Sequence, residues 1–249
     1  MSQLTNHYFD EIIALLEKVR ETQLDAVDQA AKTIAEKVAA GGRIFAFGAS
    51  HSSLPVQDIV YRAGGLMLIN PLYGPGIEAL TTRPTTLGSQ MEQMPGYGKV
   101  LLDNSPIEEG DVLIVVSVSG RNAVPVELAR EARAKGVFVV GLTSGKYTDA
   151  VTSRVPDGTK LKDHADLLLD NQVDAGDAVL NLDGVPQKFT PASGVTSTAI
   201  LHSLSAAIIE NLIERGIEAP VFLAANLDGG AEWNAKHMAE NRDRIFYLN

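Results

Sequence analysis

Five short runs of apolar residues, separated by helical patterns or turn-rich segments, most constrain the fold of this chain. They lie at residues 43–47, 66–70, 112–116, 137–141 and 167–169. Runs that are apolar throughout, without polar alternation, are typical of strands buried on both faces. Helices between such strands predict a parallel sheet that is covered on both sides. We therefore expect an α/β fold in which the carboxyl ends of the strands share one edge.

Helical patterns precede the first of these strands and recur between the others. Apolar residues at helix spacing over 8–19 and over 24–38 predict two N-terminal helices, the second ending at Gly41-Gly42. A helix through Pro55 and Arg62 is expected to end at Gly64-Gly65. The stretch that follows the strand at 66–70, up to Pro106, is the least regular, and short helices are expected in it near 87–93 and 99–102.

The last third of the chain adds a hairpin, a long helix and a tail. The hairpin is expected at 178–189 around Asp183-Gly184, and the helix at 195–214. Neither repeats nor a linker interrupt the sequence, so we predict a single domain. Its parts are N-terminal helices (1–40), a core (41–216) and a small, packed C-terminal appendage (217–249).

Composition excludes several classes of function. Over 249 residues, 45% are hydrophobic, yet no apolar run has the length of a membrane span. The first residues lack the features of a signal peptide, and the absence of cysteine excludes disulfides and thiolate sites. A formal charge of −10 argues against nucleic acid as a partner. We expect a cytoplasmic protein, with no membrane association, no cofactor and, since the histidines lack paired ligand spacing, no metal.

The most informative stretch is Ser117-Val118-Ser119-Gly120-Arg121-Asn122, which follows a buried strand and directly precedes a helix. This order places hydroxyls, an amide and free backbone N–H groups at the positive end of a helix dipole. Phosphates and other anions bind at such helix ends. Because the chain is acidic overall, an anion site here would use neutral donors instead of a positive field.

An earlier loop, Gly48-Ala49-Ser50-His51-Ser52-Ser53, has the same design after the first strand. Ligands of open parallel sheets bind outside the carboxyl ends of the strands, where both loops are expected. Serines in such loops also act as helix caps, but two loops at one edge favour a shared ligand. Arg121 and His51 could each contact that ligand or face solvent.

Three nucleotide or nucleophile motifs can be tested against these loops. Gly48 lacks the further glycines of a dinucleotide fingerprint, and the second strand ends in Asn70 instead of an acid. Neither Gly145-Lys146 nor Gly98-Lys99 is followed by the Ser or Thr that a P-loop requires. Ser119 lacks the preceding glycine of a nucleophile elbow. None of the three motifs is present.

The two loops resemble those of the sugar isomerase (SIS) domain family, over residues 30–215. Ser52 stands at the usual serine of the first loop, and Asn122 stands where the second loop more commonly has Ser or Thr. Residues 62–66 further resemble an uncharacterised single-domain, phosphosugar-binding subgroup of the family. The resemblance implies a three-layer αβα sandwich with a flavodoxin-like parallel sheet, assembled as a homodimer or homotetramer.

The resemblance also implies a phosphorylated sugar as ligand. Residues expected to hold its phosphate or its hydroxyls are Ser50, Ser52, Ser53, Ser117, Ser119, Asn122, Ser197 and Thr198. The last two open the long helix, where ordinary N-capping explains part of the hydroxyl pattern.

Two residues are candidates for catalysis of aldose–ketose isomerisation. Glu92, in the irregular segment, is the candidate base, with Glu78 as its rival; either could instead be a surface glutamate. His202 lies with Thr198 and Ser205 on a narrow polar stripe of the long apolar helix. Such a stripe must face a pocket, a partner helix or water. Related isomerases place a ring-opening histidine there, whereas a packing histidine is the alternative.

The expected function is therefore phosphosugar binding, with isomerisation through an enediol as the preferred reaction. A lyase or etherase acting on an amino-sugar phosphate would use the same anion site and a carboxylate. A non-catalytic phosphosugar sensor is the third hypothesis, although the sequence carries no fused basic or helix-turn-helix segment.

Overall fold

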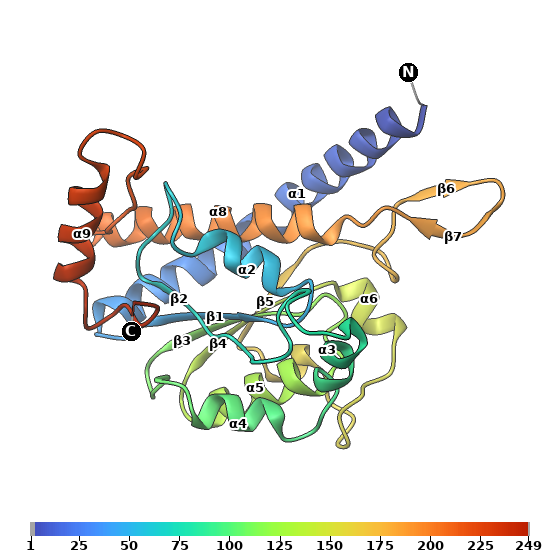
Figure 1. Ribbon diagram of the computed structural model, residues 1–249, viewed down its shortest axis with the longest axis horizontal. Helices are drawn as coiled ribbons and strands as arrows, with labels where there is room; N and C mark the ends of the chain where they lie inside the picture. The colour runs from blue at the N-terminus through green and yellow to red at the C-terminus, as the bar shows by residue number, and fades with distance from the viewer. Residues whose placement is uncertain (1–2, 249) are drawn as a thin grey trace.

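A computed structural model describes residues 3–248 as a sheet between two helical layers (Figure 1). The strands are β1 (Ile44–Gly48), β2 (Ile69–Pro71), β3 (Val112–Val116), β4 (Phe138–Thr143) and β5 (Leu167–Asp170). All pair in parallel, in the order β2-β1-β3-β4-β5. This is the flavodoxin-like order, and it confirms the expected fold class.

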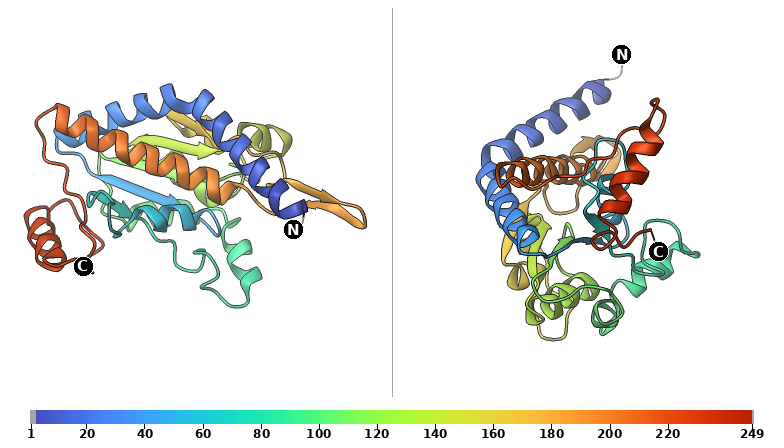
Figure 2. Two further views of the ribbon diagram at one scale, coloured as in Figure 1. Left: turned by 90° about the horizontal axis from the view of Figure 1, so that it is seen from above. Right: turned by 90° about the vertical axis from the view of Figure 1, so that its left-hand side faces the viewer.

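The two faces of the sheet carry different helices, as the views in Figure 2 show. One face packs against α1 (Gln3–Ala39), α2 (Ser53–Ile59) and α8 (Ser193–Glu214) through residues such as Ile34, Ile44 and Leu204. The other packs against α4 (Tyr97–Asp103), α5 (Ala123–Ala134) and α7 (Leu161–His164) through residues such as Phe47 and Leu128. Strands covered on both sides explain why their sequences are apolar throughout.

The N-terminal segment is one helix of 37 residues, so the expectation of two helices was wrong. No glycine or proline interrupts residues 3–39, and hydrogen bonding therefore continues through the predicted junction. Its second half packs along α8, whereas its first turns extend beyond the sheet (Figure 1). Of the helices in residues 3–248, none combines the length and apolarity needed to cross a membrane.

The segment between α2 and β2 departs from expectation. The predicted helix ends at Ile59 instead of Gly64-Gly65, and the predicted strand starts at Ile69 instead of Leu66. The cause is an interaction with the C-terminal tail. Backbone hydrogen bonds join Gly64, Gly65 and Met67 to residues 220–222, so these residues pair with the tail and not with β1.

The C-terminal appendage contains a helix that the sequence reading did not identify, α9 (Gly230–Glu240). Ile245 is buried and packs with Met67 and Phe222, which attaches the tail to the core. The hairpin forms as expected, with β6 (Leu180–Leu182) and β7 (Val185–Phe189) joined at Asp183-Gly184. It projects from the body beside the start of α8 (Figure 1).

Short helices in the irregular segment were predicted correctly in place. They are α3 (Thr85–Met91) and α4, and a further short helix, α6 (Gly145–Ala150), follows β4.

The register of the central strands sets the position of both serine loops. Gly48, the last residue of β1, pairs with Val116, the last residue of β3. The two loops therefore start side by side at one edge of the sheet.

Candidate functional site

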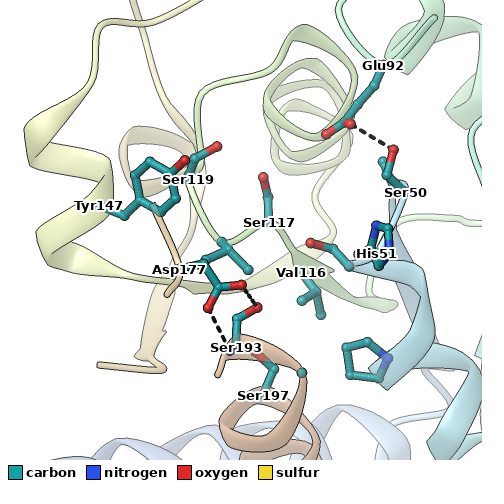
Figure 3. A pocket seen from close by; sticks show the side chains of 15 residues that line it. Ser50, His51, Glu92, Val116, Ser117, Ser119, Tyr147, Asp177, Ser193 and Ser197 are labelled. Atoms are coloured by element: carbon teal, nitrogen blue, oxygen red, sulfur yellow. Dashed lines mark hydrogen bonds between the residues drawn. The ribbon is translucent and has the colours of Figure 1, made fainter. Parts of the chain in front are cut away.

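A cavity of about 260 Å³ opens at this edge (Figure 3). Three segments supply most of its wall: the loop after β1, the loop after β3 and the first turn of α8. The rest comes from α2, the end of β3, α6 and the loops before α4 and β6. The lining residues are Ala49, Ser50, His51, Ser52, Pro55, Glu92, Val116, Ser117, Val118, Ser119, Tyr147, Asp177, Ser193, Gly194 and Ser197.

The loop after β1 turns sharply to bring its serines to the cavity. A Cβ at Gly48 would lie 2.1 Å from the carbonyl oxygen of Ser52, so only glycine permits this close approach. Ser50 adopts a positive φ of 50°, and its N–H donates to the carbonyl of Ile77 at 2.6 Å. Ser52 precedes the first residue of α2, yet its hydroxyl caps no N–H of that helix. That hydroxyl therefore has no role as a cap of α2.

The loop after β3 presents Ser117 and Ser119 from the opposite wall (Figure 3). The N–H of Ser117 donates to the backbone carbonyl of Leu142, and Gly120 turns the chain with a φ of 59°. Within residues 3–248, the hydroxyls of Ser52, Ser117, Ser119 and Tyr147 make no hydrogen bond to the protein. Four uncommitted hydroxyls thus line a single cavity, and such groups bind an anion without a full positive charge.

Glu92 follows α3 and places its carboxylate between the two loops. Its Oε2 accepts a hydrogen bond from Ser50 Oγ at 3.1 Å, and its Oε1 accepts one from Asn122 Nδ2 at 2.9 Å. Its backbone carbonyl accepts the N–H of Val124, in the first turn of α5. Hydrogen bonds therefore hold both the carboxylate and the backbone of Glu92. A carboxylate oxygen accepts more than one hydrogen bond, so capacity toward the cavity remains.

A second carboxylate, that of Asp177, caps α8. Oδ1 accepts the N–H groups of Ala192 and Ser193 at 3.1 and 2.8 Å, and Oδ2 accepts the hydroxyl of Ser193. A carboxylate at a helix N-terminus is stabilised by the unpaired N–H groups and by the helix dipole. The start of α8 already has an intramolecular anion, so a ligand's anion is better placed near Ser117 and Ser119.

The electrostatic character of the cavity is unusual for an anion site. None of its lining residues is lysine or arginine, and two are carboxylates. Arg121, a candidate for neutralising an anion, is not in the lining; its Nη2 donates to Thr152 Oγ1 at 3.3 Å. Across residues 3–248 there is no cluster of three side chains suited to a metal ion. Hydroxyls, backbone N–H groups and the imidazole of His51 are the donors that this wall offers.

The structure brings together six of the residues predicted for the site. Ser50, Ser52, Ser117, Ser119, Ser197 and Glu92 all line the cavity, and Ser197 Oγ also accepts a hydrogen bond from Asn171.

The other predicted residues lie elsewhere. Ser53 is 3% exposed and lies beneath the loop, where its hydroxyl bonds Ser50, Gln57 and Ala79. Asn122 is behind Glu92, outside the lining. Thr198 lines an adjoining cavity of about 890 Å³ beside α2. Glu78, the rival base, lines a small separate pocket behind Ser50.

His202 lines neither the serine-lined cavity nor the adjoining one. Its Nε2 lies 2.9 Å from Oδ2 of Asp58 on α2, and both side chains are about two-fifths exposed. Asp58 itself lines the adjoining cavity. The polar stripe on α8 therefore meets a neighbouring helix, which is one of the environments expected for it.

Tyr147 and Asp177 are among the lining residues that were not predicted from the sequence. Tyr147 follows β4, the next strand of the sheet, and its place after a strand could have identified it. Asp177 comes from the loop before the hairpin and reaches the cavity only because that loop folds back onto α8. Nothing local in the sequence marks it.

Comparisons with known proteins agree with the fold described above. A family model for the SIS domain matches residues 7–144. The UPF0309 protein of Streptomyces griseus is 49% identical over 246 residues, which cover 99% of this chain and 98% of that protein. Two solved structures share the fold at low identity. Phosphoheptose isomerase GmhA from Neisseria gonorrhoeae has a TM-score of 0.55 at 19% identity, covering 84% of this chain and 98% of that one. A phosphoheptose isomerase from Francisella tularensis has a TM-score of 0.54 at 18% identity, with 84% and 100% covered.

Proposed function

Since this chain belongs to the SIS domain family, we propose that its serine-lined cavity binds a phosphorylated sugar and interconverts the aldose and ketose forms. The observation that carries the proposal is the pairing of four uncommitted hydroxyls with one fixed carboxylate in a single cavity. The solved structures of similar fold include two phosphoheptose isomerases, which supports the choice of reaction.

The phosphate is assigned to Ser52, Ser117 and Ser119. These residues line the same cavity from two loops, and the second loop leads directly into the N-terminus of α5. Hydrogen bonds to a charged group contribute about 1.5–3 kcal/mol each, so three such bonds compensate for the missing cation. Tyr147 and Ser197 are then placed to contact sugar hydroxyls.

Glu92 is assigned as the base. Its carboxylate takes the proton from the carbon next to the aldehyde, and the electron pair of that C–H bond forms the enediol double bond while the carbonyl oxygen gains a proton. Return of a proton to the former aldehyde carbon, with loss of one from the neighbouring hydroxyl, gives the ketose. The two hydrogen bonds from Ser50 and Asn122 hold the carboxylate in one orientation, and orientation of this kind lowers the barrier.

His202 is proposed to assist ring opening, through the adjoining cavity. Pro55 and Asp58 line that cavity, and His202 is hydrogen-bonded to Asp58. His202 therefore contacts the ligand only if the sugar extends past Pro55 toward Asp58. In that position Asp58 would orient the imidazole as a general acid or base.

The first experiment is a thermal-shift screen of the protein with pentose, hexose, heptose and amino-sugar phosphates. Free sugars and inorganic phosphate serve as controls. A ligand that binds the folded state raises the melting temperature by mass action. Stabilisation by one phosphosugar and not by its free sugar is expected, and no response across the panel would contradict phosphosugar binding.

The reaction is tested separately by replacing Glu92. The isosteric variant Glu92→Gln should retain ligand binding and lose at least ~100-fold in isomerisation followed by NMR. Glu232→Gln, an exposed residue on α9, is the matched control. β-Elimination in place of isomerisation by the wild type would identify a lyase. Binding without turnover by the wild type would identify a sensor.

A further inference from the structure

Asn122 occupies a position that the second serine loop would be expected to use for the ligand. It directly precedes α5, yet its side chain caps none of the N–H groups of that helix. It also lies outside the lining of the cavity, although Ser117 and Ser119 of the same loop are in it. The asparagine therefore has neither of the two roles that are usual for a polar residue at this place.

Its side chain instead bridges two charged groups. Oδ1 of Asn122 accepts a hydrogen bond from Nη1 of Arg154 at 2.8 Å, and Nδ2 donates to Oε1 of Glu92 at 2.9 Å. A guanidinium can only donate and an ionised carboxylate can only accept. The amide consequently has one favourable orientation, with its NH₂ group toward Glu92, because a flipped amide would lose both bonds.

The backbone fixes both partners to the same turn. The carbonyl of Glu92 accepts the N–H of Val124, and the N–H of Arg154 donates to the carbonyl of Arg121. Hydrogen bonds thus join the side chains of Arg154, Asn122 and Glu92, and backbone hydrogen bonds hold the two outer residues beside the turn that carries Asn122. Ser50 completes it from the other side by donating to Oε2 of the same carboxylate.

We infer that Asn122 and Arg154 are positioning residues for Glu92 and that Asn122 is not a ligand of the phosphate. This inference rests on the proposed function, in which Glu92 is the base. The second serine loop is thereby divided: Ser117 and Ser119 hold the anion, while Asn122 aligns the carboxylate that moves the proton. Arg154, which is exposed, places a positive charge two hydrogen bonds from the carboxylate.

The isosteric change Asn122→Asp separates the two roles. It retains the acceptor for Arg154 but replaces the donor toward Glu92 with a second carboxylate oxygen. A like charge next to a carboxylate favours its protonated form. We expect the acid limb of the kcat profile to move up by about one pH unit or more. If Asn122 instead bound the phosphate, Asn122→Asp would weaken the binding of inorganic phosphate and leave the pH dependence of kcat unaltered.

Two further variants complete the test and replace the first one if it fails to fold. Asn122→Ser supplies the hydroxyl that is more common in the family loop but is too short to join Glu92 and Arg154. Arg154→Ala leaves the amide without its fixed orientation. Both should lower kcat by roughly ten- to a hundredfold with little change in KM, as expected for lost alignment. Arg154→Lys should recover part of the activity, and Arg242→Ala, exposed near the C-terminus, is the control.

Carbon-13 NMR of the glutamate side chains reports on the same carboxylate without any substrate. The midpoint of the Glu92 titration should move to higher pH in Asn122→Asp relative to the wild type, and Glu92→Gln assigns the signal. An unchanged midpoint together with an unchanged kcat profile would overturn the inference. If the wild type isomerises no phosphosugar, the proposed reaction fails, whereas the NMR titration still decides whether these residues act on Glu92.

Discussion

Ser50 Oγ donates a hydrogen bond to Glu92 Oε2 at 3.1 Å, which joins the loop after β1 to the end of α3, 42 residues later (Figure 3). One side chain from the first serine loop is thereby used to hold a carboxylate and not a ligand. The loop divides its work, since the next hydroxyl, that of Ser52, has no protein partner among residues 3–248. Two serines of one loop, separated by a single residue, can therefore be assigned to different tasks.

The first prediction concerns the anion. Ser119→Ala should weaken phosphosugar binding by roughly 10- to 100-fold, the equivalent of one hydrogen bond to a charged group. Its melting temperature should stay close to that of the wild type, because the hydroxyl makes no bond within the described chain. Isothermal titration calorimetry measures the affinity, with Ser203→Ala on the exposed side of α8 as control. Equal affinity in variant and wild type would remove Ser119 from the site.

Ser53 is predicted to act on stability and not on binding. Its buried hydroxyl donates to the carbonyl of Ser50 at 2.8 Å and accepts from Gln57 and from the N–H of Ala79, both at 3.1 Å. Ser53→Ala leaves these groups unpaired, so we expect a loss of about 1–3 kcal/mol in the free energy of unfolding. Urea unfolding measures it.

Ser52→Ala, one residue earlier, is the comparison for that experiment. It should lower phosphosugar affinity and leave the unfolding midpoint unchanged, because no hydrogen bond of the folded chain is lost. If Ser53→Ala lost affinity at full stability, the assignment of the two serines would have to be reversed.

A third prediction tests the role of His202. Replacement by Gln should change stability by less than ~1 kcal/mol, because the pair with Asp58 is exposed. If the imidazole assists ring opening, the kcat for sugars that cyclise should fall about 100-fold. Turnover of a phosphosugar too short to form a ring should be unaffected. A similar loss for both substrates, or none for either, would assign His202 to structure alone.

The fourth prediction is a pH dependence of stability. A hydrogen bond from Lys146, at 2.7 Å, lowers the pKa of Asp174, and the nearby positive charges lower it further. A carboxyl group whose pKa is depressed in the folded state stabilises the fold above its unfolded value, near 3.9. That contribution is lost as the pH falls through the lower, folded value.

Asp174→Asn should therefore reduce the free energy of unfolding at pH 7 by at most ~1 kcal/mol, as for other exposed ion pairs. The difference from the wild type should shrink as the pH falls below about 4. Urea unfolding at several pH values measures this, and Asp183→Asn at the hairpin tip is the control. A difference that grew on acidification would contradict the sign.

The fold was predicted well where the signal is local. The range 112–116 matches β3 because five consecutive apolar residues there are buried on both faces of the sheet. The range 66–70 was placed too early because Gly64, Gly65 and Met67 pair with the chain near Phe222. Periodicity does not report a partner more than 150 residues away. For the same reason α9, held by contacts of the tail, was not identified.

The candidate site shows the same division. The sequence by itself determined that hydroxyl-rich loops follow β1 and β3 and share one edge, because parallel pairing brings the ends of buried strands together. The tertiary structure alone decided which side chains face the cavity. Ser53, the first residue of α2, and Asn122, the residue before α5, are polar like Ser52 and Ser119. Their hydrogen-bonding groups, however, are used by Gln57, Ala79, Glu92 and Arg154. Except for Gln57, which lies one helical turn after Ser53, these partners are 26 to 32 residues away in the sequence. A polar group that is withdrawn from water bonds whichever partner the fold brings to it.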